Sequence, residues 1–331
     1  MYEVPYHNKD LSKFSFLITG GAGFIGSNIA EYLLKYGAKK VRVLDNLATG
    51  NKANVEAFKS NPAFEFIEGD IRNLETCRKA CERIDFVSHQ AALGSVPRSV
   101  KEPENTNAVN VDGFLNVLIA AKDNKVKNFV YASSSSVYGD EKTLPKVEEK
   151  TGNPLSPYAV SKWTNELYAK VFYNVYGLNV VGLRYFNIFG PRQDPKGEYA
   201  AVMPLFIDKI MKKEEVYIDG DGNQTRDFTF VENAVQANVR AMLNENAEAF
   251  NQVFNIAVGE NFSVNHLYTE IQKLLSSDHN AKYRETRKGD IRNSLADISK
   301  AKNLLGYNPE FQFGKGLAIT VEYFHKFYLA R

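Results

Sequence analysis

A regular array of glycines near the start of the chain limits the folds that this sequence can adopt. In FLITGGAGFIGSNI, Gly20, Gly23 and Gly26 follow a short apolar run and precede a segment whose apolar residues recur every four positions. The run is typical of a buried strand, and the spacing predicts a helix with one apolar face. Glycines between a strand and a helix permit a tight turn and let the backbone approach a pyrophosphate. The array therefore predicts a nucleotide-binding βαβ unit.

Strand-like and helix-like segments alternate beyond this unit. The apolar runs KVRVLD, FEFIEGD, IDFVSH and KNFVYASSS are separated by segments of helical period, one of them across 107–124, and NVVGLR at 179–184 is a further core strand. Such alternation predicts right-handed crossovers and an α/β fold with a Rossmann-type, doubly wound parallel sheet.

The composition and the regularity of the sequence change after Gly190. GPRQDPKGEYA is rich in proline, glycine and charge, and the elements that follow it are shorter and less regular. We therefore expect an NAD-binding domain over 1–190 and a smaller α/β C-terminal substrate lobe over 191–331, with a boundary near 185–195. A return of the chain from the second part to the first is left open.

The bulk composition excludes several classes of function. Lys and Arg (41) nearly balance Asp and Glu (39), which argues against nucleic acid or an anionic membrane as the main partner. The five histidines show no ligand spacing, so no metal site is expected. Cys77 and Cys81 are interpreted as packing residues on one helix face. The N-terminus lacks an apolar signal sequence and no window is long enough to span a bilayer, so a cytoplasmic protein is expected.

An acidic residue indicates which dinucleotide the first unit binds. Asp45 ends the second predicted strand, roughly 20 residues after Gly26, where a carboxylate accepts hydrogen bonds from both ribose hydroxyls of NAD. The same charge repels the additional phosphate of NADP, so NAD is the predicted cofactor. Asp70 and Ile71, in EGDIR after the third strand, suit the adenine end, and a plain surface turn is the alternative.

The stretch NPLSPYAVSK predicts a catalytic tyrosine. Ser156 and Pro157 are typical of an N-cap and a first helical position, which puts Tyr158 and Lys162 one turn apart on the same helix face. A free phenol has a pKa of about 10. A nearby ammonium group and a helix N-terminus both stabilise phenolate, so we expect a lowered pKa for Tyr158 and a role as a base. A Y-x-x-x-K match also occurs by chance.

Four serines, residues 133–136, end the strand that precedes this helix. The carboxyl ends of parallel strands meet at the edge where doubly wound folds bind ligands. A serine hydroxyl there can donate to the substrate oxygen that Tyr158 deprotonates. A polar strand end is the alternative for one or two of the serines.

These motifs together carry a family resemblance. TGGAGFIG, LDN, GDIR, SSSSVYG, YAVSK, RYFNIFGPRQ and RKGDIRNSLADISKA resemble the extended short-chain dehydrogenase/reductase family, specifically the nucleotide-sugar 4-epimerases that use bound NAD. The resemblance runs from about residue 14 to 320. Within it, the sequence is most similar to bacterial UDP-N-acetylhexosamine 4-epimerases of polysaccharide pathways.

The resemblance implies a set of site residues. The catalytic serine would be Ser134, the base Tyr158 and the ribose-binding activator Lys162. The cofactor would be bound by Gly20, Gly23, Phe24, Ile25, Gly26, Asp45, Asn46, Asp70, Ile71, Ala91, Ala92, Asn110, Tyr158 and Lys162. The UDP-sugar would contact Gly94, Ser95, Ser135, Ser136 and Gln193, with Asn187, Arg226 and Arg287 at the diphosphate and Ala201, Val202 and Tyr217 at the uracil.

The resemblance also implies a mechanism and a substrate. Tyr158 would take the proton from the sugar 4-hydroxyl while C4 passes a hydride to NAD⁺, and the 4-keto sugar would turn over and accept the hydride on its other face. Epimerases restricted to plain hexoses carry a tyrosine at the position of Ser294. The serine leaves space for a 2-acetamido group, so UDP-GlcNAc and UDP-GalNAc are the expected pair.

Several alternatives stay open at this stage. Related dehydratases and decarboxylases carry acidic residues at the positions of Ser135 and Ser136, and elimination needs such a proton donor. A UDP-uronic acid or UDP-glucose 4-epimerase fits the same motifs, and a non-catalytic NAD-binding scaffold is the alternative from another class. The resemblance implies a homodimer formed through the helices near 107–124 and 157–176. The physiological direction is not determined by the sequence.

Overall fold

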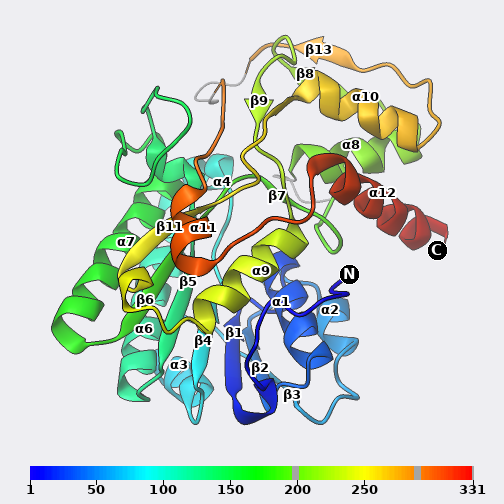
Figure 1. Ribbon diagram of the computed structural model, residues 1–331. Helices are drawn as coiled ribbons and strands as arrows, with labels where there is room; N and C mark the ends of the chain where they lie inside the picture. Colours follow the sequence, from blue (N-terminus) through cyan, green and yellow to red (C-terminus); the bar gives the residue numbers. More distant parts are fainter. Residues whose placement is uncertain (196–200, 287–291, 330–331) are drawn as a thin grey trace.

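A seven-stranded parallel sheet forms the centre of the molecule (Figure 1). The structure is a computed structural model that describes residues 1–195, 201–286 and 292–329. The strand order is β11-β6-β5-β4-β1-β2-β3. The strands are β1 (Ser15–Thr19), β2 (Lys40–Asp45), β3 (Phe64–Glu68), β4 (Phe86–His89), β5 (Asn128–Ser134), β6 (Asn179–Tyr185) and β11 (Gln252–Ile256). The predicted doubly wound α/β fold is confirmed.

The sheet reverses its winding direction between β1 and β4. From β1 the chain proceeds to β2 and β3 on one side, and β4, β5 and β6 follow on the other. All five residues of β1 are buried, as expected for a strand covered on both faces. The two crossover connections diverge at the β1–β4 boundary, which leaves a crevice outside the carboxyl ends of the strands. The topology thus places a ligand site at this edge.

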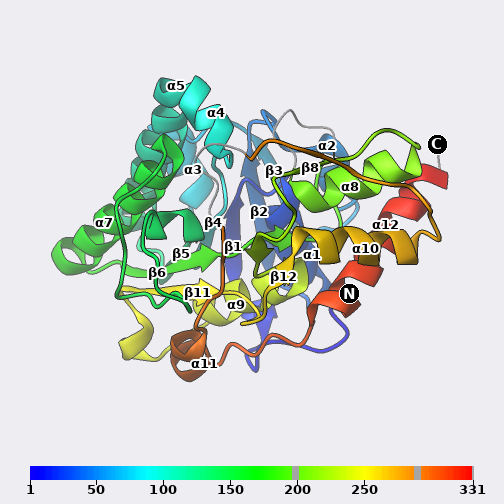
Figure 2. The ribbon, with the colours of Figure 1, turned by 90° about the horizontal axis from the view of Figure 1, so that it is seen from above.

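Helices cover both faces of the sheet (Figure 2). One face carries α3 (Leu74–Cys81), α6 (Gly113–Asp123) and α7 (Pro157–Tyr176), and the other carries α1 (Phe24–Lys35) and α9 (Val231–Met242). The shorter helical segments are η1 (Leu11–Lys13), α2 (Lys52–Glu56), α4 (Val96–Lys101), α5 (Pro103–Asn107), η3 (Ser135–Tyr138), η4 (Ala247–Ala249) and α11 (Ser299–Leu305). Cys77 and Cys81 are both buried on α3, in the core between the sheet and the helices.

The helix predicted across 107–124 is interrupted. A π-helical turn, η2 (Ala108–Asp112), joins α5 to α6. Inside this turn the Asn110 amide exchanges hydrogen bonds with the backbone of Leu93, at 2.8 and 3.3 Å. At Gly113 a Cβ would lie 2.6 Å from the Ile71 side chain, so the helix packs closely there. Such wide turns occur frequently beside functional sites, and this one supports the loop after β4.

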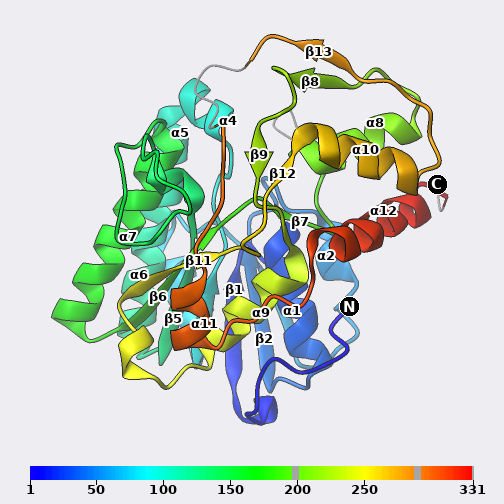
Figure 3. The same cartoon turned by 45° about the horizontal axis from the view of Figure 1, so that its top comes forward.

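Much of the second half of the chain packs beyond the carboxyl edge of the sheet. Figure 3 shows α8 (Val202–Met211), α10 (Val264–Leu274) and α12 (Phe313–Leu329) grouped there around their own apolar core. Three two-stranded pairs accompany them: β7 (Ile188–Phe189) with β10 (Thr229–Phe230), β8 (Tyr217–Asp219) with β13 (Lys282–Arg284), and β9 (Thr225–Arg226) with β12 (Phe262–Ser263).

The chain also returns to the central sheet after residue 190. Helix α9 packs on the sheet, and β11 pairs in parallel with β6, from Gln252 opposite Val181 to Ile256 opposite Tyr185. The seventh strand therefore comes from the part of the sequence that was assigned to the second lobe. The central sheet thus contains residues from both sides of position 190. The assignment of NAD binding to 1–190 and substrate binding to 191–331 stays a prediction.

Candidate active site

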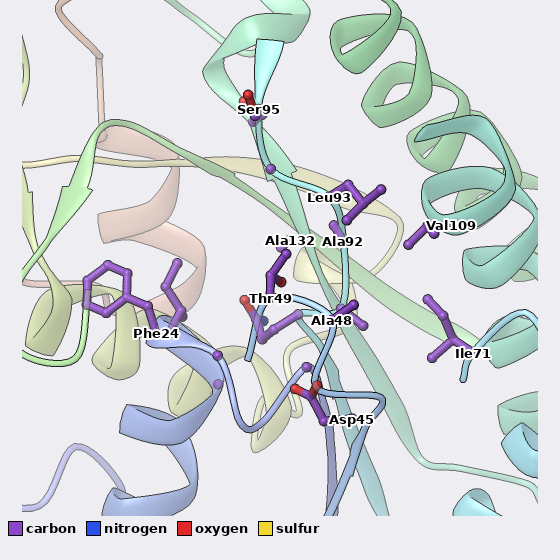
Figure 4. A pocket seen from close by; sticks show the side chains of 18 of the residues that line it. Phe24, Asp45, Ala48, Thr49, Ile71, Ala92, Leu93, Ser95, Val109 and Ala132 are labelled. Carbon is purple, nitrogen blue, oxygen red and sulfur yellow. The ribbon is translucent and has the colours of Figure 1, made fainter. Parts of the chain in front are cut away.

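A cavity of about 810 Å³ lies at the carboxyl edge of the sheet, over the point where the winding direction reverses. Nineteen of the predicted site residues line it. They are Gly20, Gly23, Phe24, Ile25, Gly26, Asp45, Asn46, Asp70, Ile71, Ala91, Ala92, Gly94, Ser95, Ser134, Tyr158, Lys162, Asn187, Gln193 and Ala201. In Figure 4, Asp45 and Ser95 lie at opposite ends, and Ile71 and Val109 lie near each other at one side.

Two glycines of the loop lie so close to neighbouring backbone that a side chain at either position would clash. At Gly20, whose φ is +68°, a Cβ would lie 2.7 Å from the backbone nitrogen of Ala91. At Gly26 it would lie 2.3 Å from the carbonyl oxygen of Gly20. The N-cap of α1 is Gly23, which has no side chain to bind the first amide groups of the helix. These N–H groups and the positive end of the helix dipole suit a pyrophosphate.

Asp45 holds the glycine loop against the end of β2. Its carboxylate accepts hydrogen bonds from the backbone N–H groups of Ala22 and Leu47, at 2.9 and 2.8 Å. Burial raises the pKa of Asp45 above its ordinary value, and these backbone hydrogen bonds oppose the rise. The carboxylate is part of the cavity wall, so the residues fit the ribose of an NAD whose pyrophosphate lies over the loop.

A second acidic group lies beside the cavity. Asp70 accepts a bidentate pair of hydrogen bonds from Arg72, at 3.0 and 2.7 Å, and a further one from Asn46 at 2.8 Å. The hydrogen bonds of Arg72 are the main reason that the pKa of Asp70 falls to about 2. Asp70 is therefore a fixed anion at neutral pH, in a position that fits the adenosine end of the cofactor.

Helix α7 begins where the sequence predicted. Ser156 is the N-cap and accepts from the backbone N–H of Ala159 at 3.1 Å, and Pro157 is the first helical residue. Tyr158 and Lys162 line the cavity from the first two turns. The Lys162 ammonium donates to the carbonyl oxygen of Ala132 on β5 at 2.7 Å, so the lysine ties the helix to the serine-bearing strand.

The expected lowering of the Tyr158 pKa by Lys162 does not appear in this structure. Burial raises the pKa of Tyr158, and only the nearby Ser134 hydroxyl opposes this rise. Lys162 lies 6.0 Å from the centre of the phenol ring and donates to Ala132 instead. Burial also lowers the pKa of Lys162, to about 8. The protein by itself therefore favours a neutral phenol, and Ser134 is the group that favours ionisation.

The four serines divide into two pairs. Ser133 and Ser134 lie on the cavity wall, and Ser134 also caps the turn η3 by accepting from the backbone N–H of Ser136 at 3.1 Å. Ser135 and Ser136 are not part of the wall in the described structure. The Ser136 hydroxyl is buried and has no hydrogen-bond partner among the described residues. β5 ends at Ser134, so Ser135 and Ser136 belong to the turn η3 and not to the strand end that the sequence predicted.

Five other predicted residues lie outside the described cavity wall. Asn110 supports the loop at Leu93, as described above, and Tyr217 and Arg226 belong to β8 and β9. Val202 begins α8, and Ser294 is buried beside β9, with its N–H donating to the carbonyl of Thr225 at 3.1 Å. Arg287 lies outside the described residues.

The wall also contains side chains that the sequence analysis did not single out. These include Thr49, Gln90, Leu93, Arg98, Tyr185 and Asp194. Gln90 directly follows β4 and Tyr185 ends β6, so the carboxyl-end rule that located the serines also applies to these two. Tyr185 donates to the Gln90 side chain at 3.1 Å and accepts from Asn238 of α9 at 2.7 Å.

Sequence comparison agrees with this geometry. The model of the NAD dependent epimerase/dehydratase family matches residues 16–257, which include the glycine loop and the Ser134, Tyr158 and Lys162 positions. The chain belongs to this family. The resemblance seen in the motifs is thereby confirmed, and NAD is the cofactor of the family. No helix in the described ranges is long and apolar enough to cross a membrane.

Relatives and solved structures in this family are similar over nearly the whole chain. A putative UDP-glucose 4-epimerase of Methanocaldococcus jannaschii is 40% identical over 93% of this chain and 97% of its own length. A UDP-N-acetylglucosamine 4-epimerase from Methanobrevibacter ruminantium, in complex with UDP-N-acetylmuramic acid, is 40% identical with a TM-score of 0.89, and covers 95% and 98% of the two chains. A UDP-glucuronic acid 4-epimerase from Bacillus cereus, in complex with UDP-glucuronic acid and NAD, is 32% identical with a TM-score of 0.88, over 95% and 100%.

Proposed function

We propose that this protein is a UDP-hexose 4-epimerase that preferentially interconverts UDP-GlcNAc and UDP-GalNAc with bound NAD. The observation that carries the proposal is the meeting of Ser134, Tyr158 and Lys162 with the glycine loop in one cavity. Proton transfer and nucleotide binding are thereby combined at a single site. Relatives named as 4-epimerases of UDP-glucose, UDP-N-acetylglucosamine and UDP-glucuronic acid support the reaction type.

The residues of the cavity would divide the chemistry between them. NAD⁺, when bound, would supply a reversible acceptor for the hydride of C4. Tyr158 would accept the proton of the sugar 4-hydroxyl, and Ser134, on the same cavity wall, would donate a hydrogen bond to that oxygen. Lys162 would bind the nicotinamide ribose and keep α7 fixed to β5 through Ala132. The same groups in reverse return the proton to the oxygen after the sugar has turned over.

The nucleotide half of the substrate would be bound beyond the sugar. Asn187, Gln193 and Ala201 lie on the cavity wall on the side of the second lobe, and we assign them to the UDP. Asn187 has a φ of +36°, and its amide donates to the carbonyl of Asp227 at 3.2 Å, which fixes the residue after β6. We retain Arg226 and Arg287 as the charges that approach the diphosphate. Firm binding of UDP leaves the hexose free to rotate.

We infer the preference for acetylated sugars from the family resemblance at position 294, where this chain has a serine that lies outside the described cavity wall. A serine there is small and 9% exposed, and its segment is tied to its neighbours by Thr225 and by a bridge between Ala296 and Lys146. UDP-glucose and UDP-uronic acids are the second candidates. Both a carboxylate, Asp194, and a guanidinium, Arg98, lie on the cavity wall, so its charges do not favour an anionic sugar over a neutral one.

A homodimer is the proposed assembly. Helix α7 presents a stripe of exposed apolar side chains at Val160, Leu167, Val171 and Val175, each at least 49% exposed. Their spacing of seven, four and four residues places them along one side of the helix. Contiguous apolar residues of this kind are typical of a surface covered by another chain. A cytoplasmic location stays a prediction.

The test is a specificity series with the purified protein. Absorbance and fluorescence of the released cofactor give the NAD content, and kcat/KM is measured for UDP-GlcNAc, UDP-GalNAc, UDP-glucose, UDP-galactose and the uronic acids. We expect the highest kcat/KM for UDP-GlcNAc and UDP-GalNAc. The Tyr158→Phe variant should lose activity. A higher kcat/KM for a uronic acid would replace the substrate assignment. A folded, NAD-loaded protein that is inactive on every UDP-hexose would support the scaffold alternative.

A further inference from the structure

Glu166 lies on the same face of α7 as the two catalytic residues. Tyr158, Lys162 and Glu166 recur every four residues along the helix, so each lies one turn beyond the last. Glu166 is not part of the described cavity wall, and its side chain is 9% exposed. Its carboxylate contacts the sheet instead. The Glu166 carboxylate therefore interacts with other protein groups and not with a ligand in the cavity.

The partners of Glu166 are on the two strands beneath the helix. One carboxylate oxygen accepts from the Ser133 hydroxyl at 2.5 Å and from Arg184 Nε at 2.9 Å, and the other accepts from Arg184 Nη2 at 2.8 Å. Ser133 of β5 and Arg184 of β6 are directly paired in the sheet. The bidentate geometry fixes both the distance and the rotation of the helix over these strands.

Arg184 also contacts residues that follow Ser134 in the sequence. Its Nη1 donates to the carbonyl of Glu148 at 2.9 Å, and its guanidinium lies 4.9 Å from the centre of the Tyr138 ring. Tyr138 belongs to η3, the turn that directly follows Ser134. The pair is thus connected to the residue before Ser134, to the turn after it, and to the helix that carries Tyr158 and Lys162.

Neither stability nor local charge accounts for this arrangement. Apolar side chains of similar size often replace a buried ion pair without loss of stability, because desolvation offsets the attraction. The negative charge of Glu166 is also balanced by Arg184. Burial of Lys162 is the cause of its lowered pKa, and Glu166 does not counteract it. What the pair supplies beyond apolar packing is a fixed geometry.

We propose that the Glu166–Arg184 pair is a positioning device for the reaction, which sets α7 against β5 so that Tyr158 meets Ser134 and Lys162 meets Ala132. The inference rests on the proposed function, because it concerns the geometry of that reaction. Misplacement of a reacting group by about 1 Å can cost on the order of 100-fold in rate. Glu166 and Arg184 act through Ser134, Tyr158 and Lys162 and do not contact the substrate.

The test replaces both charges at once, with Glu166→Met/Arg184→Met. Single substitutions leave one buried charge unpaired and destabilise the fold, so the double variant is the informative one. It is expected to keep its thermal midpoint and NAD content while kcat falls about 10- to 100-fold. KM for UDP-GlcNAc and UDP-glucose should stay within about twofold, since the groups assigned to UDP are unchanged. The acidic limb of the kcat profile should move to higher pH, because a displaced Ser134 no longer lowers the Tyr158 pKa.

A matched control and a second readout separate positioning from general loss of structure. Arg42→Met/Glu65→Met removes another ion pair of the same sheet, between β2 and β3, with an Nε to oxygen distance of 2.9 Å. Its kcat should not change. An ultraviolet titration of tyrosinate, with Tyr158→Phe subtracted, should give a higher apparent pKa for Tyr158 in the Glu166/Arg184 variant.

The titration needs no turnover, so it tests the positioning role even if the wild-type protein acts on no UDP-hexose, a result that would refute the proposed function alone. The positioning role is refuted if the double variant folds, its kcat stays within about twofold of the wild-type value, and its Tyr158 pKa stays within roughly 0.3 of a unit. An equal loss of kcat in the Arg42/Glu65 control refutes it as well.

Discussion

Tyr158 is subject to opposing effects on its ionisation. Burial favours the neutral phenol and raises its pKa, whereas the nearby Ser134 hydroxyl acts in the opposite direction and favours the phenolate. A base must be deprotonated to accept the substrate proton, so each effect has a direct counterpart in the pH dependence of the rate. Ser134 is therefore expected to act on the base as well as on the sugar oxygen.

The first prediction concerns Ser134→Ala. Loss of the Ser134 hydroxyl raises the Tyr158 pKa further, so less phenolate is present at a given pH and the acidic limb of kcat moves to higher pH. We expect kcat at neutral pH to fall by roughly 10²- to 10³-fold, at the lower end of the range of about 10²- to 10⁴-fold for one acid–base group. A pH–rate series with UDP-GlcNAc measures both effects. Ser135→Ala, outside the cavity wall, is the control, and an equal change in that variant would contradict the prediction.

The second prediction concerns the residue at position 294. Ser294→Tyr places a bulky ring in a segment that is tied to Thr225 and Lys146 and so cannot move away. The variant should lose turnover of UDP-GlcNAc and UDP-GalNAc and keep that of UDP-glucose and UDP-galactose. Steady-state rates on the four substrates measure the ratio, and the plain hexoses serve as the internal control. Unchanged turnover of UDP-GlcNAc would show that position 294 does not select the sugar.

At the scale of the element, the start of α7 determines where Tyr158, the proposed base, lies. Ser156 caps the helix, Pro157 sets its first turn, and Tyr158 follows directly, so only one residue separates the cap from the proposed catalytic tyrosine. Fraying of this turn would move the phenol away from Ser134. The cap should therefore affect the rate as well as the stability.

The third prediction uses a matched pair of caps. Ser156→Ala should reduce the free energy of unfolding by about 1 kcal/mol, and it should lower kcat as well because the first turn carries Tyr158. Ser263 caps α10 in the same way, accepting from the backbone N–H of His266 at 3.1 Å, and α10 lies outside the cavity wall. Ser263→Ala should cost similar stability and leave kcat unchanged. Urea unfolding and steady-state kinetics on both variants make the comparison, and equal kcat values would contradict it.

Elements with strong local signals were predictable from the sequence, and contacts between distant segments were not. The glycine array, the strand ends at Asp45 and Ser134, and the Ser156 cap each depend on residues close in sequence. The π-turn at 108–112 depends on Asn110 reaching Leu93, and the pairing of Glu166 with Arg184 depends on how α7 lies over β6. Neither contact has a periodic pattern. The predicted lowering of the Tyr158 pKa was wrong because burial, which raises this pKa, is a property of the tertiary structure.

At the scale of the whole molecule, the exposed stripe on α7 is the surface through which we expect two copies to associate. The opposite side of this helix carries Tyr158, Lys162 and Glu166, so one helix would contribute to both the active site and the interface. Association at this surface would also restrict motion of the helix. Oligomeric state and activity are therefore expected to be linked.

The fourth prediction tests this surface. Leu167→Asp places a charge in the stripe, at a side chain that is 55% exposed in the isolated chain, and should convert a dimer into a monomer. Leu274→Asp is the control, since Leu274 is 44% exposed on α10, away from α7. Multi-angle light scattering after size-exclusion chromatography gives both masses. Equal masses for the two variants would exclude the α7 stripe as the interface.

The late position of β11 in the sequence affects how the chain is made in the cell. Until residue 256 has been synthesised, β6 has no partner on its outer side and is an unpaired edge strand. The roughly 70 residues between the ends of these strands take several seconds to translate. During that interval the nascent sheet exposes backbone groups that pair readily with other chains. In the finished sheet β11 covers β6 and becomes the edge strand itself, with α11 packed against it. The edge of β6 is therefore covered only after this late segment has been made.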